Sequence, residues 1–219
     1  MNIERVNKHG NLLSACFLNI NKQIYILTSN IYNSEPIKVF NLDGIKIKEI
    51  NNSDIKYMDI YYDKISYKTY ILTGHRGLVK SYDYNDNIIY HIYNDYDDKS
   101  HFSIKIKKDN NLIKLIESSE DGKIRIWNFH TGELLNKIFI SEKYLFGICL
   151  WNEDYLLIGC GEETIKILDI EKSKIIGNII GHNNVVLALA KANIPYYGEC
   201  LISQENGLLV KLWKIKFNI

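Results

Sequence analysis

The feature that most constrains the fold is a strand-like segment that recurs five times at nearly equal spacing. Each copy contains a large hydrophobic residue, here called the marker residue, with a Lys or Arg two positions before it. Successive markers are 42, 45, 41 and 45 residues apart. The five markers are Phe40, Tyr82, Trp127, Leu168 and Trp213. A period in this range is typical of repeated supersecondary units.

Each period divides into four short strands. In the fourth copy, the apolar or alternating segments 144–151, 155–160, 164–170 and 172–180 are bounded by Asn, Asp, Gly and Glu. Such a pattern indicates an antiparallel meander. The chain contains two prolines and no convincing amphipathic helix, so the sequence predicts an all-β fold.

On these residues the chain resembles the WD-repeat β-propellers, whose blades have four strands in about 40–45 residues. The resemblance implies a β-propeller of about five four-stranded antiparallel blades. It also implies that His, Ser or Thr, Asp and Trp side chains form a hydrogen-bonded tetrad within a blade. Eight residues of this chain match that structural motif: Ser119, Asp121, Gly122, Trp127, Gly181, His182, Ser203 and Trp213.

The third copy, "SSEDGKIRIW", is the best single match to the motif. Its Asp121-Gly122 pair predicts the turn between the second and third strands of a blade. Trp127 is expected to bury an apolar face between neighbouring blades. Other copies depart from the pattern: three markers are not Trp, Gly-His occurs once at the family's place, and an extra residue precedes Trp213. No copy carries all four tetrad members.

We predict one propeller domain over residues 1–219. The expected blades are 9–50, 51–93, 94–140, 141–181, and 182–219 together with 1–8. Residues 3–8 resemble residues 47–52, an outermost strand, so the N-terminal segment is expected to complete the last blade and remove an exposed sheet edge. The alternative is that the five copies are part of a larger propeller.

The expected innermost strands offer little catalytic chemistry. A five-bladed propeller could be a carbohydrate-active enzyme, which requires two carboxylates roughly 5–10 Å apart. Asp59 is the one carboxylate on these strands, so this alternative is disfavoured and no catalytic residue is assigned. The histidines lack the spacing of metal ligands, and no phosphate-binding loop occurs. We therefore predict a non-enzyme without metal or cofactor.

Composition narrows the class of partner. A net charge of +1 disfavours nucleic acid and anionic membranes as partners. The four cysteines lie in apolar runs without CxxC spacing, which favours reduced core thiols. Neither a signal peptide nor a membrane span is evident. These features predict an intracellular, cytoplasmic protein.

The resemblance implies a non-catalytic scaffold or adaptor that mediates protein–protein interactions. The alternative is a propeller module of a larger signalling or enzymatic protein, and the oligomeric state stays open. Residues 94–99, with Asp95, Asp97 and Asp98, form either an acidic contact or a solvated loop. The expected protein-binding face comprises residues that precede or begin innermost strands: Tyr57, His101, Phe102, Tyr144 and Asn184.

Overall fold

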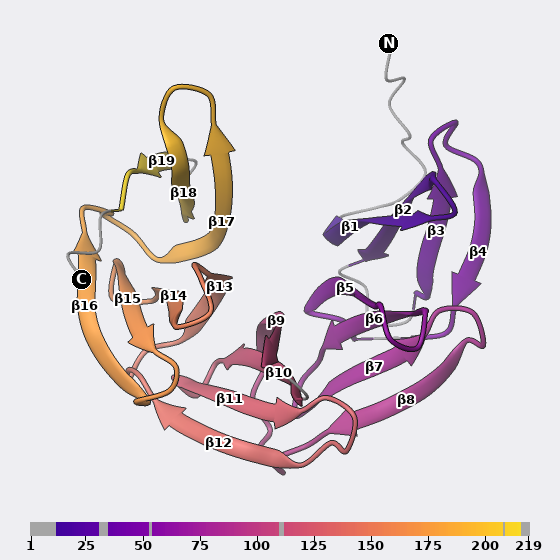
Figure 1. Ribbon diagram of the computed structural model, residues 1–219, viewed down its shortest axis with the longest axis horizontal. Helices are drawn as coiled ribbons and strands as arrows, with labels where there is room; N and C mark the ends of the chain where they lie inside the picture. The colour runs from indigo at the N-terminus through magenta and orange to yellow at the C-terminus, as the bar shows by residue number, and fades with distance from the viewer. Residues whose placement is uncertain (1–11, 31–34, 53, 110–111, 208, 216–219) are drawn as a thin grey trace. The chain divides into compact units, whose positions relative to one another are not determined.

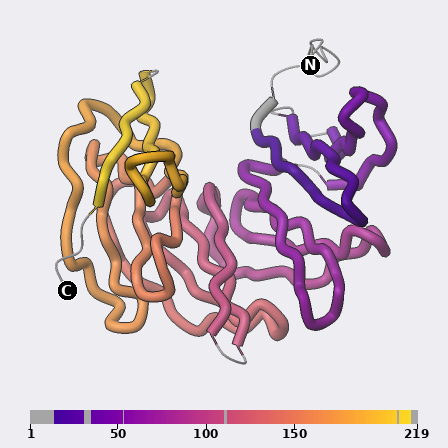
Figure 2. Tube along the Cα trace, turned by 45° about the horizontal axis from the view of Figure 1, so that its top comes forward, coloured from indigo at the N-terminus to yellow at the C-terminus, as the bar shows by residue number. Residues whose placement is uncertain are grey.

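The structure, a computed structural model, describes residues 12–30, 35–52, 54–109, 112–207 and 209–215. These residues form antiparallel β-sheets and contain no helix (Figure 1). None of the described segments is therefore a helix long and apolar enough to cross a membrane. The chain divides into two compact units, Met1–His101 and Phe102–Ile219, and each is a succession of hairpins (Figure 2).

The first unit contains two four-stranded sheets. The first sheet consists of β1 (Leu12–Ile20), β2 (Gln23–Asn30), β3 (Ile37–Asn41) and β4 (Lys46–Ile50). The second consists of β5 (Tyr57–Asp63), β6 (Lys68–Gly74), β7 (Val79–Asp83) and β8 (Ile88–Tyr93). In both sheets the spatial order of the strands is their order in the chain, which is the meander predicted from the turn residues.

The second unit contains three sheets, and its first strand begins one residue before the unit boundary. The first sheet consists of β9 (His101–Asp109), β10 (Leu112–Ser119), β11 (Lys123–Asn128) and β12 (Leu134–Phe139). The next consists of β13 (Leu145–Leu150), β14 (Tyr155–Cys160), β15 (Thr164–Asp169) and β16 (Lys174–Ile180). The last has three described strands, β17 (Val186–Ile194), β18 (Gly198–Glu205) and β19 (Val210–Trp213).

The predicted all-β fold of five antiparallel blades is confirmed. Four blades have four strands each, and the last has three among the residues that the structure describes. The segment expected to supply its fourth strand, residues 1–8, lies outside those residues. The described strands fall within the expected blade intervals from residue 9 onward. The organisation of residues 1–219 as a single domain stays a prediction.

All five marker residues lie on the third strand of a blade. Four of them are buried, namely Phe40, Tyr82, Trp127 and Leu168, while Trp213 is half-buried. In each four-stranded blade, the pairing of the third and fourth strands shifts register at the marker, as it does between Ile126 and Trp127. A β-bulge increases the local twist of a strand. The repeat seen in the sequence is therefore also a repeat of backbone geometry.

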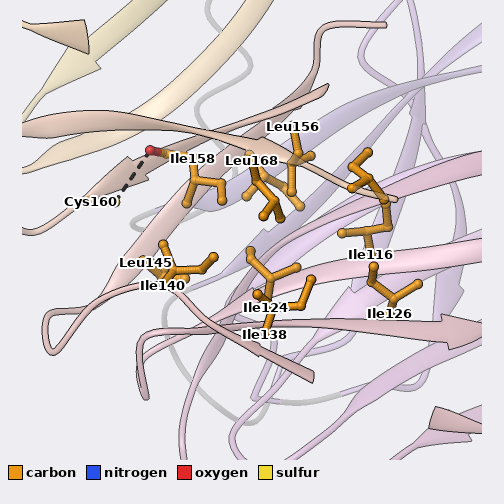
Figure 3. Close-up of a cluster of buried hydrophobic side chains, with 12 residues drawn as sticks. Ile116, Ile124, Ile126, Ile138, Ile140, Leu145, Leu156, Ile158, Cys160 and Leu168 are labelled. Carbon is orange, nitrogen blue, oxygen red and sulfur yellow. Dashed lines mark hydrogen bonds between the residues drawn. The ribbon is translucent and has the colours of Figure 1, made fainter. Parts of the chain in front are cut away.

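The buried core of each unit consists mainly of aliphatic side chains. In the second unit, Ile116 and Ile126 of one blade belong to the same buried cluster as Leu156, Ile158 and Leu168 of the next blade (Figure 3). Strands rich in β-branched residues suit such packing because these side chains fill a pleated surface well. Blade-to-blade packing therefore joins the third and fourth blades in one buried cluster, and a second cluster joins the fourth blade to the last.

Candidate functional site

The last blade holds a buried polar network around His182. The Nε2 atom of His182 lies 2.6 Å from Oγ of Ser203, and the indole Nε1 of Trp213 donates to the same oxygen at 2.7 Å. On the other side of the ring, Nδ1 lies 2.7 Å from Oε2 of Glu205. His182 and Ser203 are buried, and the contacts join the turn before β17 to β18 and β19. The network thus ties the turn that leads into β17 to β18 and β19.

Glu205 is the residue of this network that the sequence did not reveal. The family pattern directs attention to an Asp in the turn after the second strand, whereas Glu205 stands at the end of β18. Its carboxylate also accepts a hydrogen bond from the backbone N–H of Asn183 at 3.0 Å. The bond from Asn183 and that with His182 together lower the pKa of Glu205 below its ordinary value. A carboxylate therefore completes the four-residue network from a different position.

The second blade has a variant of the same arrangement. Nε2 of His75 lies 2.8 Å from Oγ1 of Thr73, and the amide of Asn52 donates to that oxygen at 3.2 Å. Thr73 pairs with Lys80 across the strands, as Ser203 pairs with Lys211 in the last blade. The hydroxyl position is retained, but the histidine stands two residues after it instead of in the preceding turn.

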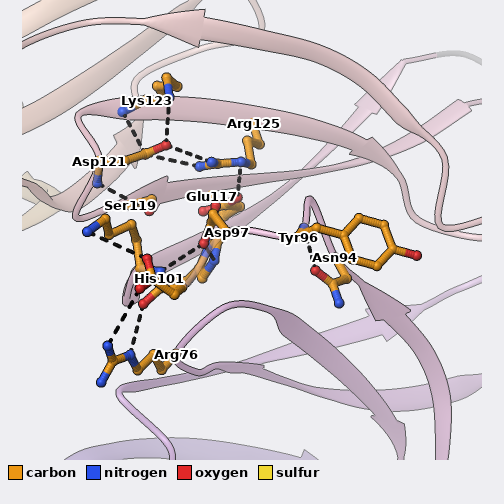
Figure 4. A network of polar contacts seen from close by, with 12 residues as sticks. Arg76, Asn94, Tyr96, Asp97, His101, Glu117, Ser119, Asp121, Lys123 and Arg125 are labelled. Carbon is orange, nitrogen blue, oxygen red and sulfur yellow. Dashed lines mark hydrogen bonds and ion pairs between the residues drawn. The ribbon is translucent and has the colours of Figure 1, made fainter.

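In the third blade an ion cluster takes the corresponding place (Figure 4). The guanidinium of the fully buried Arg125 donates to both carboxylate oxygens of Asp121, at 3.1 and 2.7 Å, and lies 3.8 Å from the carboxylate of Glu117. Burial alone would raise the pKa of Asp121, but hydrogen bonds from Arg125 and Lys123 outweigh it and hold this pKa well below its ordinary value. Asp121 is therefore bound to Arg125 within its own blade.

The other motif residues of the third blade hold the turn between β10 and β11. Gly122 has a φ of 75°, and a Cβ atom there would lie 1.8 Å from the carbonyl oxygen of Ser141. Glycine alone adopts this positive φ without strain and has no Cβ atom to clash with the carbonyl oxygen of Ser141. The hydroxyl of Ser119 accepts a long hydrogen bond from the backbone N–H of Asp121 at 3.5 Å, and Trp127 is buried on β11.

In the last blade, the motif residue Gly181 has a φ of 144° and lies next to the indole ring of Trp213.

Three aromatic rings gather where β9 and β13 begin. The rings of Phe102 and Phe146 are stacked with centroids 5.0 Å apart, and Tyr144 meets Phe146 edge-on at 6.3 Å. Phe102 and Phe146 are half-buried, while Tyr144 is 51% exposed. We call Phe102, Tyr144 and Phe146 the aromatic cluster. Two residues of the predicted protein-binding face, Phe102 and Tyr144, therefore lie together in this cluster.

Hydrogen bonds from the third blade and from within the fourth blade fix the backbone under the aromatic cluster. The hydroxyl of Ser118 donates to the carbonyl of Phe146, and the hydroxyl of Ser103 accepts from the backbone N–H of Ile148 at 3.3 Å. The backbone N–H of Gly161 donates to the carbonyl of Tyr144 at 2.9 Å. These bonds connect β9, β10 and β13 with the turn after β14. The rings therefore stand on a backbone that is hydrogen-bonded to three other segments of the second unit.

The remaining residues of the predicted face are not part of the aromatic cluster. Asn184 is exposed and caps its own turn by accepting from the N–H of Val185 at 2.8 Å. Tyr57 lies in the first unit, is half-buried and donates to Asp59 at 3.2 Å. The expectation for His101 is wrong, because this side chain is 1% exposed and its Nε2 lies 3.4 Å from the carboxylate of Asp97.

The acidic segment 94–99 is held by bonds within the first unit. The backbone N–H of Gly77 donates to the carbonyl of Lys99 at 2.7 Å, and Nε of Arg76 donates to the carbonyl of Asp98 at 2.9 Å. Asp97 faces the buried His101 (Figure 4). The segment is thus bound to the turn between β6 and β7.

The described residues offer no evident catalytic constellation. They contain no group of three or more His, Cys, Asp or Glu side chains placed to hold a metal ion. Asp59, the carboxylate considered for glycan hydrolysis, accepts hydrogen bonds from Tyr57 and from the N–H of Ile60. All four cysteines are free, and burial raises the pKa of Cys160 to about 12. A thiol with such a pKa is a poor nucleophile at neutral pH.

Comparison with known proteins identifies the same architecture. The chain is similar to the solved structure of U3-55K, with a TM-score of 0.75 and 14% identity over 93% of this chain and 61% of that one. It is also similar to the WD40 β-propeller domain of Doa1, with a TM-score of 0.72 and 14% identity over 94% of this chain and 65% of that one. The computationally designed Ika4 protein matches 67% of this chain with a TM-score of 0.53, 21% identity and 86% of its own length.

One curated relative is similar in sequence. The U3 small nucleolar RNA-associated protein 21 homolog of Schizosaccharomyces pombe is 23% identical over 101 residues. The match covers 46% of this chain and 11% of that protein. No known protein-family profile matches the chain. At these identities the comparisons establish architecture: the chain has the fold of the WD40 β-propellers that its repeats resemble, with five blades.

Proposed function

We propose that this chain is a non-catalytic scaffold or adaptor that binds other proteins. The observation that carries the proposal is the aromatic cluster, in which the exposed Tyr144 stands beside Phe102 and Phe146 on a hydrogen-bonded backbone. Aromatic side chains are frequent anchors of protein interfaces. A surface that is already ordered loses little conformational entropy on binding. WD40 propellers are scaffolds in general, which agrees with this assignment.

The proposal includes a location in the cytoplasm or another reducing compartment. The four free cysteines support it, because thiols persist where disulfides do not form. It does not include an RNA ligand, although two of the similar proteins carry U3 in their names. The net charge of +1 offers little electrostatic attraction for a phosphate backbone.

Affinity purification from the source cells followed by mass spectrometry tests the scaffold function. The bait is compared with its Tyr144→Ser, Phe146→Ser double variant and with Phe139→Ser, a control at an exposed aromatic residue of β12. We expect a set of proteins that the wild type and the control retain and the double variant loses. Equal recovery with all three baits would contradict binding at the aromatic cluster, and recovery of RNA without protein would contradict the scaffold.

A second candidate is a module of a larger protein. It is favoured by the comparisons, because the chain spans 11% of the curated relative and 61–65% of the two natural propellers. A module that lacks part of its propeller should self-associate through the open edge of a sheet. Size-exclusion chromatography with light scattering distinguishes the two, since a monomer at all concentrations would argue against the incomplete module.

A further inference from the structure

The surroundings of the aromatic cluster point to the chemistry of its partner. Resting on the proposed function, we propose that the cluster binds an extended peptide segment in which an apolar side chain is flanked by Lys or Arg. The apolar residue would contact Tyr144 and Phe146, and the cations would face glutamates in the adjoining turns. The argument needs the position of those turns, their charge, and an apolar surface.

Three turns of the second unit lie together beside Tyr144. The backbone N–H groups of Ile140 and Ser141 donate to the carbonyl of Gly122, at 2.9 and 3.2 Å. This places the turn between β10 and β11 against residues 140–143. The bonds from Gly161 to Tyr144 and from the hydroxyl of Ser141 to Glu162 place the turn between β14 and β15 against the same segment. The aromatic cluster thus adjoins turns 120–122 and 161–163.

These turns carry more carboxylates than their own cations neutralise. Asp121 holds Arg125 and Lys123, and Glu162 holds Lys166 at 3.1 Å. Outside these pairs, the exposed carboxylates of these turns are Glu142 and Glu163, and Lys143 is the exposed cation beside them. An exposed surface with two such carboxylates and one such cation favours a cationic partner. The chain's overall charge of +1 makes this a local property.

The apolar part of the surface fits a single side chain with its flanking backbone. The stacked rings of Phe102 and Phe146 leave Tyr144 as the exposed member, and Tyr144 offers a hydroxyl beside its ring. On the adjacent β17, Leu187 is 37% exposed, and its carbonyl oxygen lies 2.9 Å from where a Cβ of Gly147 would be. An apolar anchor between charged flanks is therefore the ligand that matches this surface.

Selection from an unbiased peptide library tests the proposal. The whole chain is immobilised and challenged with phage that display random 16-residue peptides, and the affinity of enriched peptides is then measured by fluorescence polarisation. We expect enrichment of Leu, Ile or aromatic residues flanked by Lys or Arg. Tyr144→Ser combined with Phe146→Ser should weaken binding about tenfold or more. The control Phe139→Ser should leave the affinity unchanged.

Charge reversal tests the electrostatic part separately. Glu142→Lys combined with Glu163→Lys should lower the affinity for the basic peptides and shift a new selection toward Asp and Glu, while the apolar anchor is retained. Glu153→Lys is the matched control, because Glu153 is exposed in the turn between β13 and β14 at the other end of these strands. Circular dichroism confirms that each variant is folded.

The outcomes separate this inference from the scaffold function. Enrichment of acidic or uncharged peptides, no enrichment at all, or an affinity that charge reversal leaves unchanged would overturn the inference. If proteins still co-purify through Tyr144 and Phe146 in that case, the scaffold function stands and only the partner chemistry is wrong. Tight binding of a single-stranded RNA oligonucleotide in place of peptides would overturn both.

Discussion

At the scale of single residues, Ser203 is the common partner of the network in the last blade. Its buried hydroxyl contacts both the imidazole of His182 and the indole of Trp213. Removing the hydroxyl leaves the buried Nε2 of His182 and the indole nitrogen of the half-buried Trp213 without this partner. Such orphaned groups cost more than the average hydrogen bond gains.

Ser203→Ala should therefore lower the free energy of unfolding by about 1–3 kcal/mol. Urea denaturation followed by tryptophan fluorescence measures the change. Thr131→Ala, in an exposed turn, is the control and should change stability by no more than about 0.5 kcal/mol. If the two variants unfold at the same urea concentration, the network does not hold the blade together.

Glu205 makes the stability of the last blade depend on pH. Because hydrogen bonds from Asn183 and His182 lower its pKa in the folded state, the unfolded state takes up the proton first as the solution is acidified. The contribution is fully present above the ordinary pKa of 4.5 and is lost as the pH falls through the lower, folded-state pKa. Glu205→Gln should flatten this part of the curve of unfolding free energy against pH, measured between pH 3 and 7. An unchanged curve would show that Glu205 is not coupled to folding.

At the scale of strands, β13 and β17 approach unusually closely at Gly147. A Cβ atom at this position would lie 2.8 Å from the Cα atom of Ala188, and the nearest atoms around it all belong to the backbone of β17. Gly177 on β16 is a matched position, because a Cβ there would meet only the end of the Ile167 side chain at 3.6 Å. The close approach keeps the beginning of β13, and with it the aromatic cluster, against β17.

Gly147→Ala should destabilise the protein by about 1–3 kcal/mol, as overpacking of a filled interior does. Gly177→Ala should be neutral or slightly stabilising, since alanine restricts the unfolded chain. Thermal unfolding by circular dichroism compares the two. Equal melting temperatures would mean that the two strands can separate without cost.

The strands also show how much of the structure could be predicted from the sequence. The marker residues, the Asp121-Gly122 turn and the innermost strands follow from local periodicity and turn chemistry, and the structure confirms their placement. Phe146 could not be singled out, because "LFGICL" predicts a strand whichever residue is exposed. Glu205 was missed because the family pattern places an Asp in the turn after β18, whereas the longer side chain of Glu205 reaches His182 from the end of β18 itself. His101 was misjudged because a position before a strand does not reveal that Asp97 will cover it.

At the scale of the whole molecule, the thiols report on compactness in both units. Cys16 lies in the first unit, and the others lie in the second. Burial, followed by the nearby charge of Asp59, raises the pKa of Cys16 to about 12, and burial raises that of Cys160 to the same range. At pH 8 these thiols are almost entirely protonated in the folded chain and therefore unreactive.

Ellman's reagent at pH 8 should thus modify the native protein slowly, whereas four thiols should react at once in 6 M guanidinium chloride. Mass spectrometry of partly modified protein assigns the order of reaction. Rapid modification of Cys16 before the other three would show that the first unit opens without the second.

The guanidinium inside the third blade has a consequence for the chain in acid. Arg125 retains its proton at every pH at which proteins are handled, whereas Asp121, whose pKa the guanidinium itself holds well below its ordinary value, becomes neutral only in strong acid. Protonation of Asp121 then removes a counter-charge from a guanidinium that is fully buried and cannot lose its own proton. Water must reach the guanidinium to solvate it. Acid-induced unfolding should therefore begin in the third blade and extend to the fourth, with which it shares a buried cluster.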